Sequence, residues 1–121
     1  MKPVPVFVVS AALWLGVSSL SHAVFGDPER GKLVYSQRCA MCHGVNGDGN
    51  NGMAANFQQE WHRFTKSDEE LAESIRNGFQ TPGKHYTAGA MPPQFLTDRE
   101  LDDVVTYLRE TFGSEPKFLD Y

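Results

Sequence analysis

The chain has 121 residues, of which 40% are hydrophobic and 21% are charged. This length suits one domain and excludes a multi-domain enzyme, while the composition excludes a disordered or fibrous protein. The 11 basic and 15 acidic residues give a formal net charge of -4, which argues against a nucleic acid partner because phosphates bind basic surfaces.

The N-terminal segment matches the pattern of a secretory signal peptide. Lys2 forms a basic start, an apolar run follows from Val4 to Leu20, and Ser21-His22-Ala23 is a small-x-small cleavage site. The alternative is an uncleaved membrane anchor, because the run reaches the lower limit of what spans a bilayer. Prolines, serines and a glycine within the run weaken that alternative, so we expect cleavage.

Cleavage divides the chain into a signal peptide, residues 1–23, and a mature domain, residues 24–121, with a core at about 25–113 and a tail at 114–121. The mature domain has no further apolar run long enough to cross a membrane. We therefore expect a soluble protein that is exported to the periplasm and has no stable membrane insertion.

The first predicted helix of the domain begins after Asp27, whose side chain can cap it. Pro28 then takes the first helical position, where its missing N–H is harmless. The helix runs towards Cys39, and Leu33 and Val34 are expected to form its apolar face.

Two further helices are predicted from capping boxes, in which a Ser or Thr and a Glu three residues later satisfy each other's free N–H groups. One begins at Ser67 and ends at Asn77-Gly78, with apolar residues at helical spacing: Leu71, Ile75 and Phe79. The other begins at Thr97 and ends at Gly113, and its buried face is expected to contain Leu101, Val104, Val105, Leu108 and Phe112.

Two long segments between these helices are rich in Gly, Pro and Asn and show no alternating strand pattern. They run from Gly44 to about Thr65 and from about Gly78 to Leu96. The fold class is therefore predicted to be all-α. Loops of this length are unusual in a compact domain unless they serve a function, and wrapping a prosthetic group would explain them.

The segment Cys39-Ala40-Met41-Cys42-His43 is a C-x-x-C-H motif, the pattern of c-type haem attachment. Two cysteines one helical turn apart present their sulfurs on one side, where they can add across the vinyl groups of a haem. The next residue is then directed at the porphyrin centre. Cys39 and Cys42 are therefore the candidate thioether links, and His43 is the candidate proximal iron ligand.

Three other interpretations of this motif compete with haem. In an exported protein the two cysteines could form a disulfide. A thioredoxin-like redox pair requires a βαβ context that this sequence lacks, and a zinc site needs a fourth ligand in a spacing unlike known structural zinc patterns. The adjacent histidine, the predicted export and the methionine segment before the last helix together favour haem.

Gly89-Ala90-Met91-Pro92-Pro93 lies directly before the last predicted helix and supplies a candidate sixth iron ligand, Met91. An isolated methionine more often fills a core, but small residues and two prolines fix the loop around this one. His85 and His62 are alternatives for the position. Met53 follows the proximal ligand too closely in sequence to cross easily to the other face of a haem.

The chain resembles the class I c-type cytochromes, small monohaem electron-transfer proteins, over roughly residues 25–113. Besides the C-x-x-C-H motif, the residues that carry the resemblance are Gly31, Tyr35, Gly44, Gly47-Asp48-Gly49, Ile75-Arg76-Asn77-Gly78, Gly89-Ala90-Met91-Pro92 and Tyr107-Leu108. The resemblance implies three main helices and long loops wrapped around one covalently attached haem c. It implies that His43 and Met91 are the axial ligands and that both motif cysteines are thioether anchors.

The resemblance also predicts one helix contact and shows one departure from the family pattern. Gly31 and Tyr107 are expected where the first and last helices cross, because a small residue lets an aromatic ring approach closely. Family members commonly have a proline whose carbonyl accepts a hydrogen bond from the proximal imidazole, but this chain has Met53-Ala54-Ala55-Asn56-Phe57 there. A backbone carbonyl near Ala55 could still accept the bond, because the proline ring is not needed.

Several weaker signals surround the motif. The Gly-rich segment 46–52 lacks the later positions of a calcium loop, so its glycines are expected to turn the backbone tightly beside the porphyrin. Acidic residues in the first turns of two helices complement the helix dipoles and could steer a basic partner. Donors that could meet haem propionates, with structural or solvent-exposed roles as the alternative, are Trp61, Arg76, Lys84 and Tyr86.

The expected function is single-electron transfer without catalytic residues. An iron held by His43 and Met91 has no open position for a substrate, and methionine ligation favours a raised reduction potential. We expect a periplasmic carrier that shuttles electrons between redox protein partners, such as a dehydrogenase and a terminal oxidase or reductase. One alternative is a haem subunit docked permanently to a dehydrogenase or reductase, and a weaker one is a peroxidase or gas-binding haem protein.

Overall fold

The structure is a computed structural model that describes residues 1–8 and 26–114. Residues 1–8 have no regular secondary structure. Most of the predicted signal peptide and the C-terminal tail from residue 115 lie outside the described residues. Among the residues that are described, no helix is both long enough and apolar enough to cross a membrane.

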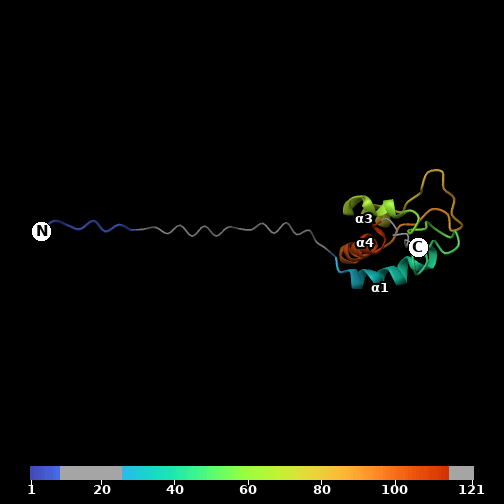
Figure 1. The fold of residues 1–121 in the computed structure, drawn as a ribbon, viewed down its shortest axis with the longest axis horizontal. Coiled ribbons are helices and arrows are strands. Elements are labelled where there is room, and N and C mark those ends of the chain that lie inside the picture. The colour runs from blue at the N-terminus through green and yellow to red at the C-terminus, as the bar shows by residue number, and fades with distance from the viewer. Residues whose placement is uncertain (9–25, 115–121) are drawn as a thin grey trace, which may run out of the picture.

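The domain is built from helices joined by long loops (Figure 1). The elements in chain order are α1 (Pro28–Arg38), α2 (Ala40–His43), the 3-10 helix η1 (Trp61–Thr65), α3 (Asp68–Asn77) and α4 (Asp98–Phe112). The three predicted long helices are α1, α3 and α4. Within the described ranges the only extended pairing is an isolated antiparallel bridge between Phe79 and Met91, so the all-α class is confirmed.

The predicted caps form as the sequence requires. The side chain of Asp27 accepts hydrogen bonds from the amides of Glu29 and Arg30 at the start of α1. Ser67 and Thr97 each form a complete capping box at the starts of α3 and α4. These bonds satisfy amides that have no partner within the helix, which explains why the helices begin where the sequence predicted.

Helices α1 and α4 cross at Gly31, where no side chain larger than hydrogen fits. A Cβ atom on Gly31 would overlap the carbonyl oxygen of Asp103 and lie 2.7 Å from Cβ of Tyr107, which confirms the predicted Gly31–Tyr107 contact. Beside the crossing, the buried carboxylate of Asp103 accepts hydrogen bonds from the amide of Asp27 at 2.7 Å and from Nε of Arg30 at 3.0 Å. The first and last helices are thus joined by polar contacts as well as by packing.

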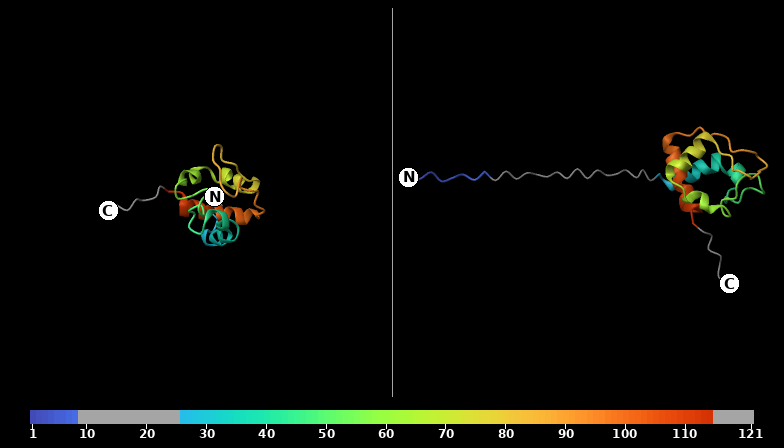
Figure 2. Two further views of the ribbon diagram at one scale, coloured as in Figure 1. Left: turned by 90° about the vertical axis from the view of Figure 1, so that its right-hand side faces the viewer. Right: turned by 90° about the horizontal axis from the view of Figure 1, so that it is seen from above.

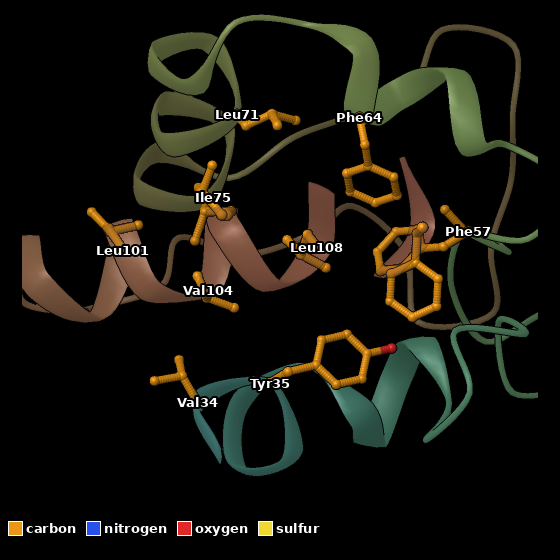
Figure 3. Packing of buried hydrophobic residues seen from close by; sticks show 12 residues of the cluster. Val34, Tyr35, Phe57, Phe64, Leu71, Ile75, Leu101, Val104 and Leu108 are labelled. Carbon is orange, nitrogen blue, oxygen red and sulfur yellow. The ribbon is translucent and has the colours of Figure 1, made fainter. Parts of the chain in front are cut away.

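The hydrophobic core lies between α1, α3 and α4 and continues into an aromatic group beside η1 (Figure 3). Its members are Val34, Tyr35, Ala55, Phe57, Phe64, Leu71, Ile75, Leu101, Val104, Val105, Leu108 and Phe112. The prediction for Leu33 was wrong: its side chain is exposed, because Gly31, Val34 and Tyr35 form the buried face of α1. The predicted end of the second helix at Asn77-Gly78 is confirmed, and Phe79, which continued its apolar spacing, belongs to the bridge that follows.

The two long loops extend from the helices towards the same end of the domain (Figures 1 and 2). The amides of Thr87 and Ala88 in the second loop donate to the carbonyls of Gly52 and Met53 in the first, both at 3.0 Å. Four glycines of the first loop, at positions 44, 47, 49 and 52, have positive φ angles, as its composition predicted. Neither capping nor periodicity predicted η1, which forms the end of this first loop.

Candidate functional site

The C-x-x-C-H motif forms a short helical turn directly after α1. Cys39 ends α1 and precedes α2, while Cys42 and His43 lie within α2. Gly44 ends this turn with φ 83°, and the buried hydroxyl of Tyr35 donates to the Gly44 carbonyl at 2.6 Å. The turn brings both sulfurs and the imidazole to the lining of one cavity.

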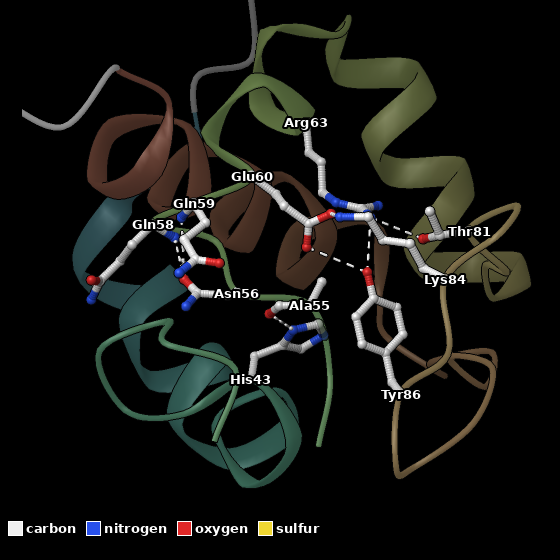
Figure 4. Close-up of polar contacts among 10 residues, drawn as sticks. All are labelled: His43, Ala55, Asn56, Gln58, Gln59, Glu60, Arg63, Thr81, Lys84 and Tyr86. Atoms are coloured by element: carbon white, nitrogen blue, oxygen red, sulfur yellow. Dashed lines mark hydrogen bonds and ion pairs between the residues drawn. The ribbon is translucent and has the colours of Figure 1, made fainter. Parts of the chain in front are cut away.

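The imidazole of His43 is buried and held on two sides. Its Nδ1 lies 3.1 Å from the carbonyl oxygen of Ala55 (Figure 4), and because a carbonyl only accepts, Nδ1 carries the proton. The ring stacks on Phe57 with centroids 4.2 Å apart and planes at 21°. Burial lowers the pKa of His43, although the bond to Ala55 opposes the shift. The remaining nitrogen, Nε2, is therefore unprotonated at neutral pH and able to bind a metal.

The Ala55 carbonyl is thus the acceptor for the His43 imidazole, the role that a proline carbonyl commonly has in this type of protein. Ala55 lies where the first loop turns back towards its own start. The amide of Phe57 donates a hydrogen bond to the carbonyl of Gly47 at 2.7 Å, which fixes this part of the loop. An acceptor of this kind sets the orientation and basicity of a ligating imidazole.

The two cysteines are half-buried and form no disulfide with each other. Burial, together with the nearby Cys42 sulfur, raises the pKa of the free Cys39 thiol to about 11. The described residues contain no group of three or more His, Cys, Asp or Glu side chains arranged to hold a metal ion.

Met91 lines the same cavity as the C-x-x-C-H motif although it lies far along the chain. The bridge to Phe79, with hydrogen bonds of 2.9 and 3.0 Å in the two directions, fixes the Met91 backbone beside the end of α3. The other three sixth-ligand candidates are absent from the cavity lining. His62 and His85 are exposed, and Met53 is half-buried in the first loop.

The cavity has the chemical character that a haem requires. Its lining is mainly apolar, with Leu71, Ile75 and Leu108 contributed by α3 and α4. The charged side chains in the lining are all cationic, namely Arg38, Arg63 and Lys66. The Nε atom of Arg63 is buried without a hydrogen-bond partner, which is costly unless an acceptor is supplied. A flat apolar group bearing carboxylates fits both features.

The four candidates for contact with haem propionates differ in their position relative to the cavity. Tyr86 lines the cavity, whereas Trp61, Arg76 and Lys84 do not. Arg76 instead pairs with Asp98 at 3.6 Å across the surface. The three lining cations were missed because each lies in a segment where sequence showed only solvent-exposed charge. No local sequence pattern separates them from solvent-exposed cations, because contacts between distant segments, such as that of Arg63 with Thr81, form this side of the cavity.

A comparison with models of protein families identifies the family of this chain. The family model of cytochrome c matches residues 28–112. The chain belongs to the cytochrome c family. It is a class I monohaem c-type cytochrome with the all-α fold of that class, and it carries one covalently attached haem c. For the matched residues 28–112, membership of this family implies electron transfer through the haem c.

Two curated relatives are similar to this cytochrome. The CcoP subunit of the cbb3-type cytochrome c oxidase of Helicobacter pylori is 26% identical over 89 residues, which cover 74% of this chain and 29% of the subunit. Cytochrome c6 of Gloeothece citriformis is 28% identical over 113 residues, which cover 91% of this chain and 94% of the relative. The chain therefore spans less than a third of the CcoP length. No solved structure gave a significant match.

Proposed function

We propose that this cytochrome is a single-electron carrier in which Cys39 and Cys42 form the thioether links to haem c and His43 and Met91 are the axial iron ligands. The observation that carries the proposal is the shared cavity, which Met91 lines together with the three motif residues. Haem c with one histidine and one methionine ligand suits electron transfer, because both axial positions are filled and methionine raises the reduction potential.

The chain's own residues prepare the site for this chemistry. When bound, haem c supplies an iron that takes up and releases one electron. The Ala55 carbonyl and the Phe57 ring hold the His43 imidazole in one orientation, so the ligand does not reorganise when charge changes. The apolar side chains of α3 and α4 exclude water, and Arg63 offers its unpaired Nε to a carboxylate of the haem.

Visible spectra of the purified protein test this proposal. We expect a haem that resists extraction into acidified organic solvent, is low-spin in both oxidation states, and does not bind carbon monoxide when reduced. A reduced spectrum that shifts on addition of carbon monoxide would remove Met91 as a firm ligand and favour a gas-binding or peroxidase function. Absence of covalently bound haem would refute the thioether links.

The similarity to CcoP favours a second candidate function, a haem subunit fixed to an oxidase or another redox complex. In that relative, the matching part is a fraction of a larger oxidase subunit. Native-host purification at increasing salt separates the two. A mobile carrier elutes alone from a sizing column, whereas a fixed subunit co-purifies in constant ratio with its complex.

We further propose that residues 1–23 direct export to the periplasm and are then removed. The support is the order of a basic start, an apolar run and Ser21-His22-Ala23. N-terminal sequencing of the protein from its native host should begin at Val24. A sequence that begins at Met1, with the protein in the membrane fraction, would favour the anchor instead.

A further inference from the structure

A buried carboxylate, Glu60, organises a polar cluster beside the cavity (Figure 4). Glu60 is 7% exposed and precedes η1. Its Oε1 accepts a hydrogen bond from Nη2 of Arg63 at 2.9 Å and another from Nζ of Lys84, while its Oε2 accepts from the hydroxyl of Tyr86 at 3.3 Å. Two cations and one hydroxyl thus converge on a single anion.

Most of the side chains in the cluster come from the loop that ends at Met91. Nη2 of Arg63 also contacts Oγ1 of Thr81 at 2.9 Å and the hydroxyl of Tyr86 at 3.1 Å. Thr81, Lys84 and Tyr86 all lie between the two residues of the bridge, Phe79 and Met91. We call residues 79–91 the Met91 loop. Its polar side chains reach the rest of the domain here through Glu60 and Arg63.

Other attachments of the Met91 loop are few. Pro82 to His85 and Thr87 to Ala90 are exposed, and Gly83 and Gly89 have positive φ angles with open space around them. Its other links are the backbone bonds of Thr87 and Ala88 to the first loop and the bridge at its base. Tyr86 and Met91 also pack against the edge of the core, and Arg63 and Lys66 lie over the Phe79 ring. A loop with so little buried apolar surface depends on its polar contacts for order.

We propose that Glu60 is a positioning residue that fastens the Met91 loop to η1 and thereby holds Met91 at the cavity. The inference rests on the proposed function, in which the Met91 sulfur is an iron ligand. The physical cause is charge balance. Without the Glu60 carboxylate, Nη2 of Arg63 and Nζ of Lys84 would lose the acceptor that they share, and the repulsion between the two cations would weaken the hold of the loop on η1.

The Glu60→Gln variant of the holoprotein tests this role, because glutamine keeps the shape of the side chain and removes its charge. We expect a weaker near-infrared band of sulfur-ligated ferric iron, carbon monoxide binding by the reduced form, and amide hydrogen exchange at Thr87 and Ala88 faster by about tenfold. Glu73→Gln, at an exposed carboxylate on α3, is the matched control and should behave as the wild type.

Two less disruptive variants test the same contacts if Glu60→Gln does not fold. Lys84→Gln changes a side chain that is 48% exposed, and Tyr86→Phe removes only a hydroxyl. Each should shift the same three readouts in the same direction, by less. The double variant Glu60→Gln/Lys84→Gln should shift the three readouts no further than Glu60→Gln alone, because both changes remove the same contact between Glu60 and Lys84.

The possible failures are distinguishable. If the wild type itself lacks the sulfur band and binds carbon monoxide, the proposed Met91 ligation fails, and this inference fails with it. If the wild type shows the band and Glu60→Gln retains it, together with inertness to carbon monoxide and wild-type exchange in the loop, Glu60 does not position Met91 and only the inference is overturned.

Discussion

The crossing of α1 and α4 allows a sharp test of how tightly this domain is packed. In Gly31→Ala, the added methyl group would meet the carbonyl oxygen of Asp103 and Cβ of Tyr107. Neither atom can rotate away, because one is backbone and the other is fixed to it. The two helices must therefore separate, which also strains the contacts between Asp103 and the start of α1.

The expected cost follows from two opposing effects. Overpacking a core costs about 1–3 kcal/mol, and a clash with backbone belongs at the upper end of that range. Alanine in a helix regains about 1 kcal/mol relative to glycine. The net loss is therefore about 2 kcal/mol in the free energy of unfolding, which lowers the Tm of a domain this size by roughly 8–16 °C.

Denaturant unfolding of the holoprotein, followed by far-ultraviolet circular dichroism, measures this loss. Lys32→Ala, at the exposed neighbouring position, is the matched control and should stay within about 0.5 kcal/mol of the wild type. A Gly31→Ala midpoint equal to or above that of the wild type would refute the close contact between the helices.

Three further predictions concern pH and the haem site. Hydrogen bonds from Arg30 hold the pKa of Asp103 below its ordinary value, so its stabilisation is complete at neutral pH and is lost as the pH falls below about 3.9 towards the lower folded-state pKa. The unfolding midpoint of Asp103→Asn should therefore be lower at pH 7 and approach that of the wild type in acid; a constant gap across pH would contradict this. Met91→Ala should bind carbon monoxide when reduced and have a lower reduction potential by voltammetry, with Met53→Ala as the unchanged control. Cys39→Ser/Cys42→Ser should lose haem staining on denaturing gels, and retained stain would exclude thioether attachment.

Local features of the sequence predicted the helices well, because capping and periodicity act within a few residues. The capping boxes at Ser67 and Thr97 placed the starts of α3 and α4 correctly. Leu33 was misassigned because hydropathy alone does not show which side of a polar helix faces its neighbour. The 3-10 helix η1 was missed because a single short turn leaves almost no periodic signal.

The site was predictable where one segment contains the chemistry and not where distant segments meet. The C-x-x-C-H motif is contiguous, and the expected backbone acceptor near Ala55 was found in the structure. The contacts of Glu60 and Arg63 with Thr81, Lys84 and Tyr86 join residues that are 18, 24 and 26 positions apart. No local pattern encodes such contacts, because they depend on how two irregular loops pass each other.

The bridge at the base of the Met91 loop has a consequence for how the protein can vary. Phe79 and Met91 bond to each other in both directions, so the bridge closes the two ends of the loop. Doubling the length of such a closed loop costs only about 0.6 kcal/mol in chain entropy. Residues inserted next to Gly89, where a side chain would meet open space, could therefore reshape the protein's outer contour while the bridge and the Glu60 contacts keep Met91 at the cavity.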